Sequence, residues 1–249
     1  SNIVIPDKDR SGESIDISWT VTNTGDAYAA SSWADRVYLS DGTLNDAILI
    51  DTLRSDADLA SGQQYTTPIR KVLLPEVTDG DYQIVVVSDF DNEVFEGRNE
   101  NNNLRISDTT MRIGRVDLVP TITSSPTIAT SGTTISLEWS VTNTGLAESP
   151  SNWVDRIYLS TDDKFDTNDL LLNERLFDDS LSSNSSYLGQ LDIDLPLEIS
   201  GNRYLLLVTD ADEQIKELGS EDNNVTKSAI EIELADYADL AVSNVTVTE

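Results

Sequence analysis

Hydrophobic and polar residues alternate with a period of two along most of the chain. The segment SIDISWTVT, from Ser14 to Thr22, places an apolar side chain at every second position. This pattern is typical of a β-strand with one buried face. Similar segments follow between turns rich in Gly, Pro, Asn and Asp, and no segment has a helical period. The first half of the chain is therefore predicted to form strands near residues 3–5, 14–23, 33–40, 47–53, 65–74, 80–89 and 104–113.

Two of these segments also predict a position within a sheet. Segment 65–74 contains Pro68, and a proline within a strand usually marks an edge or a bulge. The segment YQIVVVSD, from Tyr82 to Asp89, is the most apolar of the first half, which predicts a central strand. About seven short strands with regular turn signals are the pattern of an immunoglobulin-like β-sandwich.

The whole pattern occurs twice. The segment SWTVTNTGDAYAASSWADRVYLS, from Ser18 to Ser40, matches EWSVTNTGLAESPSNWVDRIYLS, from Glu138 to Ser160. A self-similarity of this kind indicates a tandem array. The residues that recur 120 positions later are Trp19, Asn23, Gly25, Trp33, Asp35, Arg36, Tyr38 and Ser40.

The predicted fold class is therefore all-β, with tandem immunoglobulin-like β-sandwiches of about seven strands each. One sandwich is expected over residues 1–114, with residues 3–5 as the truncated remainder of its first strand, and the next over 115–236. Within residues 237–249 the segment ADLAV is similar to VDLV at 116–119, which predicts the start of a third repeat. We therefore expect the chain to be an excerpt from a longer array.

The recurring aromatic and charged residues are interpreted first as parts of the fold. Trp19 and Trp139 lie in register with inward-facing apolar residues, so we expect both in the core. Trp33 and Trp153 begin a strand and are expected to pack inside as well; exposed tryptophans would instead form a platform for sugars. Asp and Arg at 35–36 face opposite sides of a strand, so each is expected to anchor a neighbouring strand or loop rather than to form a recognition pair.

Acidic residues dominate the charge of the chain. There are 45 Asp and Glu against 16 Lys and Arg, which gives a formal net charge of −29. Binding to nucleic acid or to anionic lipid through a basic surface is therefore excluded. Self-repulsion weakens the compact state unless salt screens it or cations neutralise it, so we expect high ionic strength or divalent metal.

The composition also argues against catalysis. Cys and His are both absent, which removes disulfides, thiolate metal sites and the usual general base. There is no phosphate-binding loop, no G-x-S-x-G motif, no apolar run of a membrane span and no signal-peptide pattern. A glycosidase-like carboxylate pair remains an alternative, but no cleft is predicted for it. We expect no enzyme activity, no nucleic-acid partner and no direct membrane insertion.

An acidic hairpin is the best candidate for chemistry, and it recurs in both repeats. Its side chains stand at relative positions 1, 3, 5 and 12, which are ligand positions of an EF-hand calcium loop. Val94 and Ile215 replace the glycine needed at position 6, which excludes an EF-hand and leaves a looser Ca²⁺-binding turn. A solvated hairpin whose Asp and Asn cap their own turns is the alternative. The candidate ligands are Asp89, Asp91, Glu93, Glu100, Asp210, Asp212 and Glu221.

Two further segments carry clustered oxygen atoms. The loop from Thr161 to Asp169 is a second candidate for calcium, with Asp162, Asp166 and Asn168 as its ligands. The closing segments at 100–103 and 221–224 are instead interpreted as structural, because Asn side chains can satisfy loop backbone groups.

These motifs together resemble a known family. W-x-V-T-N-x-G, then W-x-D-R-[VI]-Y-L-S, then D-x-D and a closing E-[ND]-N-N resemble CARDB, the cell-adhesion-related domain found in bacteria. The resemblance covers both repeats almost completely. It implies immunoglobulin-like sandwiches in large secreted or surface-anchored bacterial and archaeal proteins.

We therefore expect a non-catalytic extracellular module, structural or adhesive, of a cell-surface protein or fibre, stabilised by calcium. Its partners would be neighbouring repeats of the same chain, other copies in a fibre, or glycans and proteins of cell surfaces. The alternative is a carbohydrate-binding accessory module of a secreted enzyme, which a flat strip of exposed aromatic side chains would favour.

Overall fold

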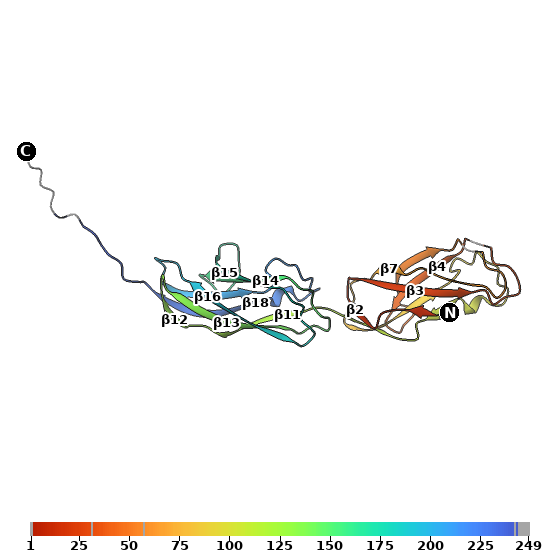
Figure 1. Ribbon diagram of the computed structural model, residues 1–249, viewed down its shortest axis with the longest axis horizontal. Helices are drawn as coiled ribbons and strands as arrows, with labels where there is room; N and C mark the ends of the chain where they lie inside the picture. Colours follow the sequence, from red (N-terminus) through yellow and green to blue (C-terminus); the bar gives the residue numbers. More distant parts are fainter. Residues whose placement is uncertain (1, 31, 57, 242, 244–249) are drawn as a thin grey trace, which may run out of the picture. The chain divides into compact units, whose positions relative to one another are not determined.

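The computed structural model describes residues 2–30, 32–56, 58–241 and 243 (Figure 1). Contacts between Cα atoms divide the chain into two compact units. The first holds Ser1–Val116 and Gly145–Ser149, and the second holds Asp117–Thr144 and Pro150–Glu249. Over the described residues both units consist of strands, loops and short 3₁₀ turns, which confirms the all-β prediction.

The first unit consists of two packed sheets. Its strands are Ile3–Val4 (β1), Lys8–Arg10 (β2), Ser14–Thr22 (β3), Ala34–Ser40 (β4), Ile48–Arg54 (β5), Gln64–Thr66 (β6), Arg70–Leu73 (β7), Gly80–Val87 (β8), Leu104–Ile106 (β9) and Met111–Gly114 (β10). One sheet has the order β1–β3–β6, and β7 also pairs with β3. The other has the order β2–β10–β8–β4–β5, and β9 pairs with β8.

The second unit repeats this topology. Its strands are Leu118–Ser124 (β11), Ile128–Thr130 (β12), Thr134–Asn143 (β13), Trp153–Ser160 (β14), Leu170–Phe177 (β15), Ser186–Asp194 (β16), Gly201–Val208 (β17) and Val225–Glu233 (β18). The sheet orders are β11–β13–β16 and β12–β18–β17–β14–β15.

The first strand of each unit changes sheets midway. β1 and β11 pair antiparallel with β3 and β13, whereas β2 and β12 run parallel beside β10 and β18 of the other sheet. When each interrupted strand of the described residues is counted once, both units have the predicted seven strands. Two immunoglobulin-like sandwiches in tandem are therefore confirmed.

Pro68 divides a strand that the sequence predicts as continuous. The predicted segment 65–74 forms β6 and β7, which both pair with β3 and are separated by residues 67–69. Proline has no backbone N–H to donate to the ladder. The matching strand of the second unit, β16, has no proline and runs unbroken. The predicted central strand is confirmed as β8, which lies between β4 on one side and β9 and β10 on the other.

The described part of the predicted third repeat forms no strand. Residues 236–241 and 243 have no assigned secondary structure, and 242 and 244–249 lie outside the described residues. No described helix is long and apolar enough to span a membrane.

All four tryptophans are buried, as expected. Trp19, Trp139 and Trp153 are at most 1% exposed, and Trp33 is 3% exposed. In the second unit Gly189 of β16 pairs with Trp139, and a Cβ on this glycine would lie 2.1 Å from the indole ring. A larger residue at this position would displace the ring from the core.

A buried aspartate links the two sheets of each sandwich. Asp155 of β14 is fully buried, and its carboxylate accepts hydrogen bonds from Trp139 Nε1 at 2.9 Å, Thr209 Oγ1 at 2.7 Å and the Tyr187 hydroxyl. Trp139 and Tyr187 belong to the opposite sheet, on β13 and β16. Burial raises the pKa of Asp155, and hydrogen bonds from Tyr187, Thr209 and Trp139 oppose this rise.

The first unit contains the same arrangement. Asp35 accepts hydrogen bonds from Trp19 Nε1 at 2.8 Å, Ser88 Oγ at 2.7 Å and the Tyr65 hydroxyl. The interpretation of this recurring aspartate as an anchor for neighbouring strands is therefore confirmed.

We expect Asp155→Ala to destabilise the second unit strongly. The substitution leaves two buried donors and the partly buried Tyr187 hydroxyl without this acceptor, and each orphaned buried group costs about 1 to 3 kcal/mol. The total loss should be on the order of 3 kcal/mol or more, measured by urea unfolding followed through tryptophan fluorescence. The control is Asp178→Ala at an exposed position. Equal stability of the two variants would contradict the anchoring role.

Candidate functional site

The first residue of each acidic hairpin caps the hairpin's own backbone. Asp89 accepts the N–H groups of Glu93 and Val94 at 2.8 and 2.9 Å, one on each carboxylate oxygen. Asp210 accepts those of Gln214 and Ile215 in the same way, at 2.9 and 2.7 Å. Asp89 and Asp210 are buried and have left-handed backbones, with φ of 48° and 47°. The hairpin therefore uses position 1 as an internal cap.

The next carboxylates of the hairpins bind arginines. Asp91 accepts Arg36 Nη2 at 2.9 Å, and Asp212 accepts both terminal nitrogens of Arg156 at 2.7 and 3.1 Å. Glu93 pairs with Arg54 Nη2 at 2.6 Å. These pairs are partly exposed, and such pairs contribute about 0 to 1 kcal/mol each. The recurring arginine thus ties the hairpin to β4 or β14, as its interpretation as an anchor predicts.

The last candidate ligand of each hairpin closes the same loop. Glu100 accepts the N–H of Glu96 at 3.1 Å, and Glu221 accepts the N–H of Glu217 at 2.9 Å. Both glutamates begin short 3₁₀ turns, Glu100–Asn102 and Glu221–Asn223. The residue at relative position 12 of the hairpin therefore binds the backbone of its own loop in both units.

The candidate loop at 161–169 is exposed and stabilised by its own side chains. Asp162 accepts the N–H of Lys164 at 3.0 Å, and Asp166 accepts that of Asn168 at 2.7 Å. Asp169 in turn accepts the N–H of Asp166 at 2.8 Å. These are turn contacts within the loop.

Across the described residues, no three acidic side chains come together in a group that could hold a metal ion. The hairpin carboxylates diverge toward backbone N–H groups and arginines, so the spacing 1, 3, 5 and 12 does not correspond to convergence in space. Calcium binding by the hairpins or by loop 161–169 stays a prediction.

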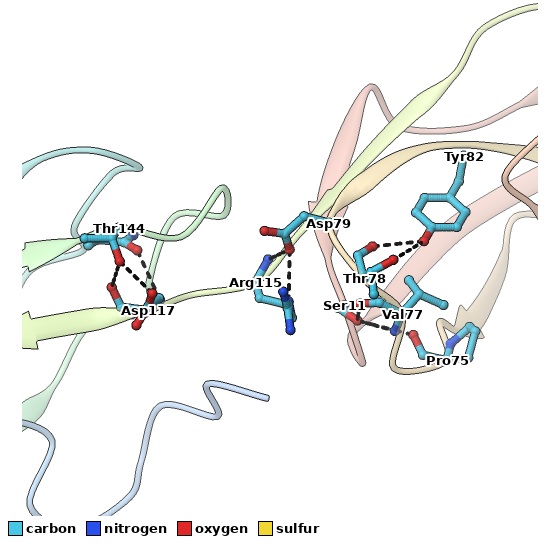
Figure 2. A network of polar contacts seen from close by, with 10 residues as sticks. Ser11, Pro75, Val77, Thr78, Asp79, Tyr82, Arg115, Asp117 and Thr144 are labelled. Carbon is cyan, nitrogen blue, oxygen red and sulfur yellow. Dashed lines mark hydrogen bonds and ion pairs between the residues drawn. The ribbon is translucent and has the colours of Figure 1, made fainter. Parts of the chain in front are cut away.

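Sequence reasoning missed a buried glutamate that receives the start of β11. Glu217 is fully buried, and its Oε2 atom accepts the N–H of Leu118 at 3.1 Å. The preceding residue, Asp117, accepts a hydrogen bond from Thr144 Oγ1 at 2.6 Å (Figure 2). It also accepts one from Asn223 Nδ2 at 2.8 Å. The available signal was the recurrence of Glu96 and of the closing E-[ND]-N-N segment, whose Asn223 makes one of these contacts.

Burial raises the pKa of two carboxyl groups in this region. It raises the pKa of Glu217 to about 8; the Leu118 N–H lowers this value, while Glu221 and Asp117 raise it. Burial also raises the pKa of Asp210 to about 6, against hydrogen bonds from Ile215 and Gln214.

A groove of about 650 Å³ opens on the first unit. Its walls come from the end of β3 with the following loop, residues 19–29, and from the hairpin and closing segment, residues 94–103. Tyr28 and Phe95 line it and are 61% and 93% exposed.

The end of the first unit lies on its opposite flank. Asp79 accepts the backbone N–H of Arg115 at 2.9 Å and its Nε at 3.1 Å, and Ser11 Oγ accepts the N–H of Val77 at 2.7 Å (Figure 2). The two contacts of Asp79 hold the segment that leaves β10.

The fold and the recurring motifs define tandem immunoglobulin-like modules, and comparison with known proteins gives their family. The chain belongs to the CARDB family, whose sequence profile matches residues 1–106 and again 115–228. CARDB is a cell-adhesion-related domain family that is non-catalytic in general. The resemblance seen in the sequence is therefore confirmed. A search of curated proteins finds no match to the chain.

Several solved structures are similar to parts of the chain. A CARDB domain from Pyrococcus furiosus, in complex with di-metal ions, is 18% identical, with 49% of this chain and 96% of that domain covered and a TM-score of 0.38. A Listeria innocua β-glucosidase in complex with glucose is 13% identical over 47% of this chain and 16% of the enzyme, with a TM-score of 0.32. A red sea bream transglutaminase is 10% identical over 94% of this chain and 32% of the enzyme, with a TM-score of 0.33. These values carry no information about ligand or activity.

The buried Glu217 predicts a pH dependence of stability. Its carboxyl has a pKa of about 8 in the folded state against an ordinary value of 4.5, so the folded state binds an extra proton between these values. The free energy of unfolding therefore decreases as the pH rises from about 4.5 to about 8. Glu217→Gln should remove this contribution and gain on the order of 1 to 3 kcal/mol over the unsubstituted chain at pH 8, with little gain at pH 5.

Urea unfolding at both pH values measures the effect. Glu213→Gln, at an exposed position of the same loop, is the matched control and should leave the pH dependence unchanged. An unaltered pH dependence in Glu217→Gln would show that this carboxyl does not bind the extra proton.

Proposed function

We propose that the chain is a non-catalytic structural or adhesive part of a bacterial or archaeal cell-surface protein or fibre. The observation that carries the proposal is the use of the recurring motif inside each sandwich. Trp19, Asp35 and Arg36 bind within their own unit, and so do their counterparts in the second. A motif used in this way supports a repeated building block rather than a reactive site.

The connection between the repeats supports a mechanical role. β10 ends at Gly114 and β11 begins at Leu118, so three residues join one sandwich to the next. An array of folded modules with short connections can be extended while its linkers keep little conformational freedom. In this role the chain acts as a spacer that extends away from the cell surface. Partners bind to other parts of the polypeptide or to other copies of it.

The carbohydrate-binding alternative has weaker support. A sugar platform needs flat, exposed aromatic rings, and all four tryptophans are buried. Two exposed rings, Tyr28 and Phe95, line the groove of the first unit and are a feature in its favour.

Surface location is tested on cells of the source organism. Antibodies raised against the chain should label intact cells, and brief treatment of intact cells with protease should remove the signal. An antibody against a cytoplasmic protein, which labels only permeabilised cells, is the control. Labelling that requires permeabilisation would overturn the proposed location.

Calcium stabilisation is part of the proposal and has a separate test. Carboxylates in excess repel one another, so calcium should raise the melting temperature of chelator-treated protein at millimolar concentration. Sodium chloride at equal ionic strength measures screening alone. A site in loop 161–169 predicts that the double substitution Asp162→Asn and Asp166→Asn removes the excess effect of calcium. A melting temperature that responds equally to both salts would contradict specific calcium binding.

A further inference from the structure

One short motif that the proposed function does not use occurs three times in the chain. It is Asn-x-Ser/Thr, the acceptor sequence for N-linked glycans in secreted proteins. Its asparagines are Asn184, Asn224 and Asn244, and Asn244 lies outside the described residues. The motif also arises by chance, so the surroundings of the other two asparagines decide which of them can carry a glycan.

The side chain of Asn224 is buried inside the second unit. It is 6% exposed. With its amide nitrogen turned toward β11, this nitrogen donates to Leu118 O at 2.8 Å and to Glu217 Oε2 at 3.1 Å. A sugar on the same nitrogen would displace the start of β11 and break both contacts. The folded second unit therefore requires an unmodified Asn224.

Asn184 has the opposite surroundings. It is exposed and lies in the turn that precedes β16. Its backbone N–H donates to Asn143 O at 2.8 Å, which fixes the turn. Its side-chain nitrogen donates to Ser183 Oγ at 3.1 Å, in a solvent-exposed contact between neighbours. A sugar on this nitrogen extends into solvent and leaves the backbone contact of the turn intact.

The third residue of this motif lies at the surface as well. Ser186 is exposed and is the first residue of β16. Its hydroxyl lies 2.7 Å from Thr142 Oγ1, on the exposed side of the pairing between β16 and β13. The hydroxyl at this position is part of what defines the acceptor sequence. The amide and the hydroxyl of the motif are thus both at the surface, two residues apart.

The first unit shows that this turn does not require asparagine. The matching residue is Gly62, whose N–H donates to Asn23 O at 2.9 Å, as that of Asn184 does to Asn143 O. Both backbones are left-handed, with φ of 74° and 58°. A Cβ added at Gly62 would meet no atom within 4 Å. Glycine is the usual residue for this conformation and asparagine is tolerated in it, so the backbone alone does not explain the amide.

We propose that Asn184 carries an N-linked oligosaccharide. The donor is a lipid-linked oligosaccharide, in which C1 of the first sugar is bonded to a phosphate oxygen. Transfer breaks this C1–O bond and forms a bond from C1 to Asn184 Nδ2. The amide gives up one proton, and the lipid phosphate leaves with the electron pair of the broken bond. The inference rests on the proposed surface location, because N-linked glycans belong to secreted proteins.

Peptide mass spectrometry of the chain purified from cells of the source organism tests the proposal. Trypsin cuts after Lys and Arg, so Asn184 lies in peptide 176–203 and Asn224 lies in peptide 217–227. Peptide 176–203 should be heavier by the mass of an oligosaccharide, and fragmentation should assign the attachment to Asn184. Peptide 217–227 should have its unmodified mass.

Two substitutions copied from the first unit remove the acceptor and preserve the turn. Asn184→Gly introduces the glycine found at Gly62, and Ser186→Gln introduces the residue found at Gln64 while Asn184 stays in place. Each should leave peptide 176–203 without an oligosaccharide when the variant is produced in the same cells. Ser186→Thr, which preserves the motif, should keep it. Circular dichroism confirms that each variant is folded.

Three results would overturn the proposal. They are an unmodified peptide 176–203 from the unsubstituted chain, an oligosaccharide that persists in Asn184→Gly or Ser186→Gln, and an oligosaccharide on Asn224 of the folded protein. Antibody labelling of intact cells tests the surface location separately. An unmodified peptide from protein that is labelled on intact cells counts against the glycan alone, whereas labelling that requires permeabilisation counts against the location.

Discussion

Each sandwich depends on one carboxylate in its core that binds donors from both sheets. Apolar faces attract one another without direction, so they leave the relative position of two sheets poorly determined. A buried carboxylate is different, because it is tolerated only when its oxygens are satisfied. Asp155 meets this condition with Trp139 and Tyr187 from the opposite sheet and with Thr209, the residue that follows β17 of its own sheet. The same constraint explains why tryptophan and aspartate recur together sixteen residues apart in each repeat.

The fold could be predicted from the sequence because alternation reports burial directly. The strands, the edge marked by Pro68 and the inward tryptophans all follow from local patterns. The partners of Asp155 could not be predicted, because Tyr187 and Thr209 lie 32 and 54 residues away. Glu217 was also missed, since a glutamate among polar residues indicates a solvated loop, whereas here the start of β11 covers it.

The acidic hairpins show why ligand spacing is weak evidence for a metal site. A loop that binds calcium and a loop that caps itself both need an oxygen at the first position. In this protein Asp89 and Asp210 bind backbone N–H groups, and the following carboxylates turn toward arginines. Only the direction of the side chains distinguishes the two cases, and direction is not encoded in spacing.

The contacts of Asp117 and Leu118 change what counts as one module of the array. Glu217, Asn223 and Asn224 stand near the end of the second repeat, yet they bind its first two residues. Residues at the end of the second repeat thus bind the residues at its beginning. A recombination event that duplicates or deletes modules must therefore cut before the Asp-Leu pair. A cut a few codons later would separate the Asp-Leu pair from the side chains that bind it. The position of the genetic boundary is therefore constrained more narrowly than the ends of the strands alone would indicate.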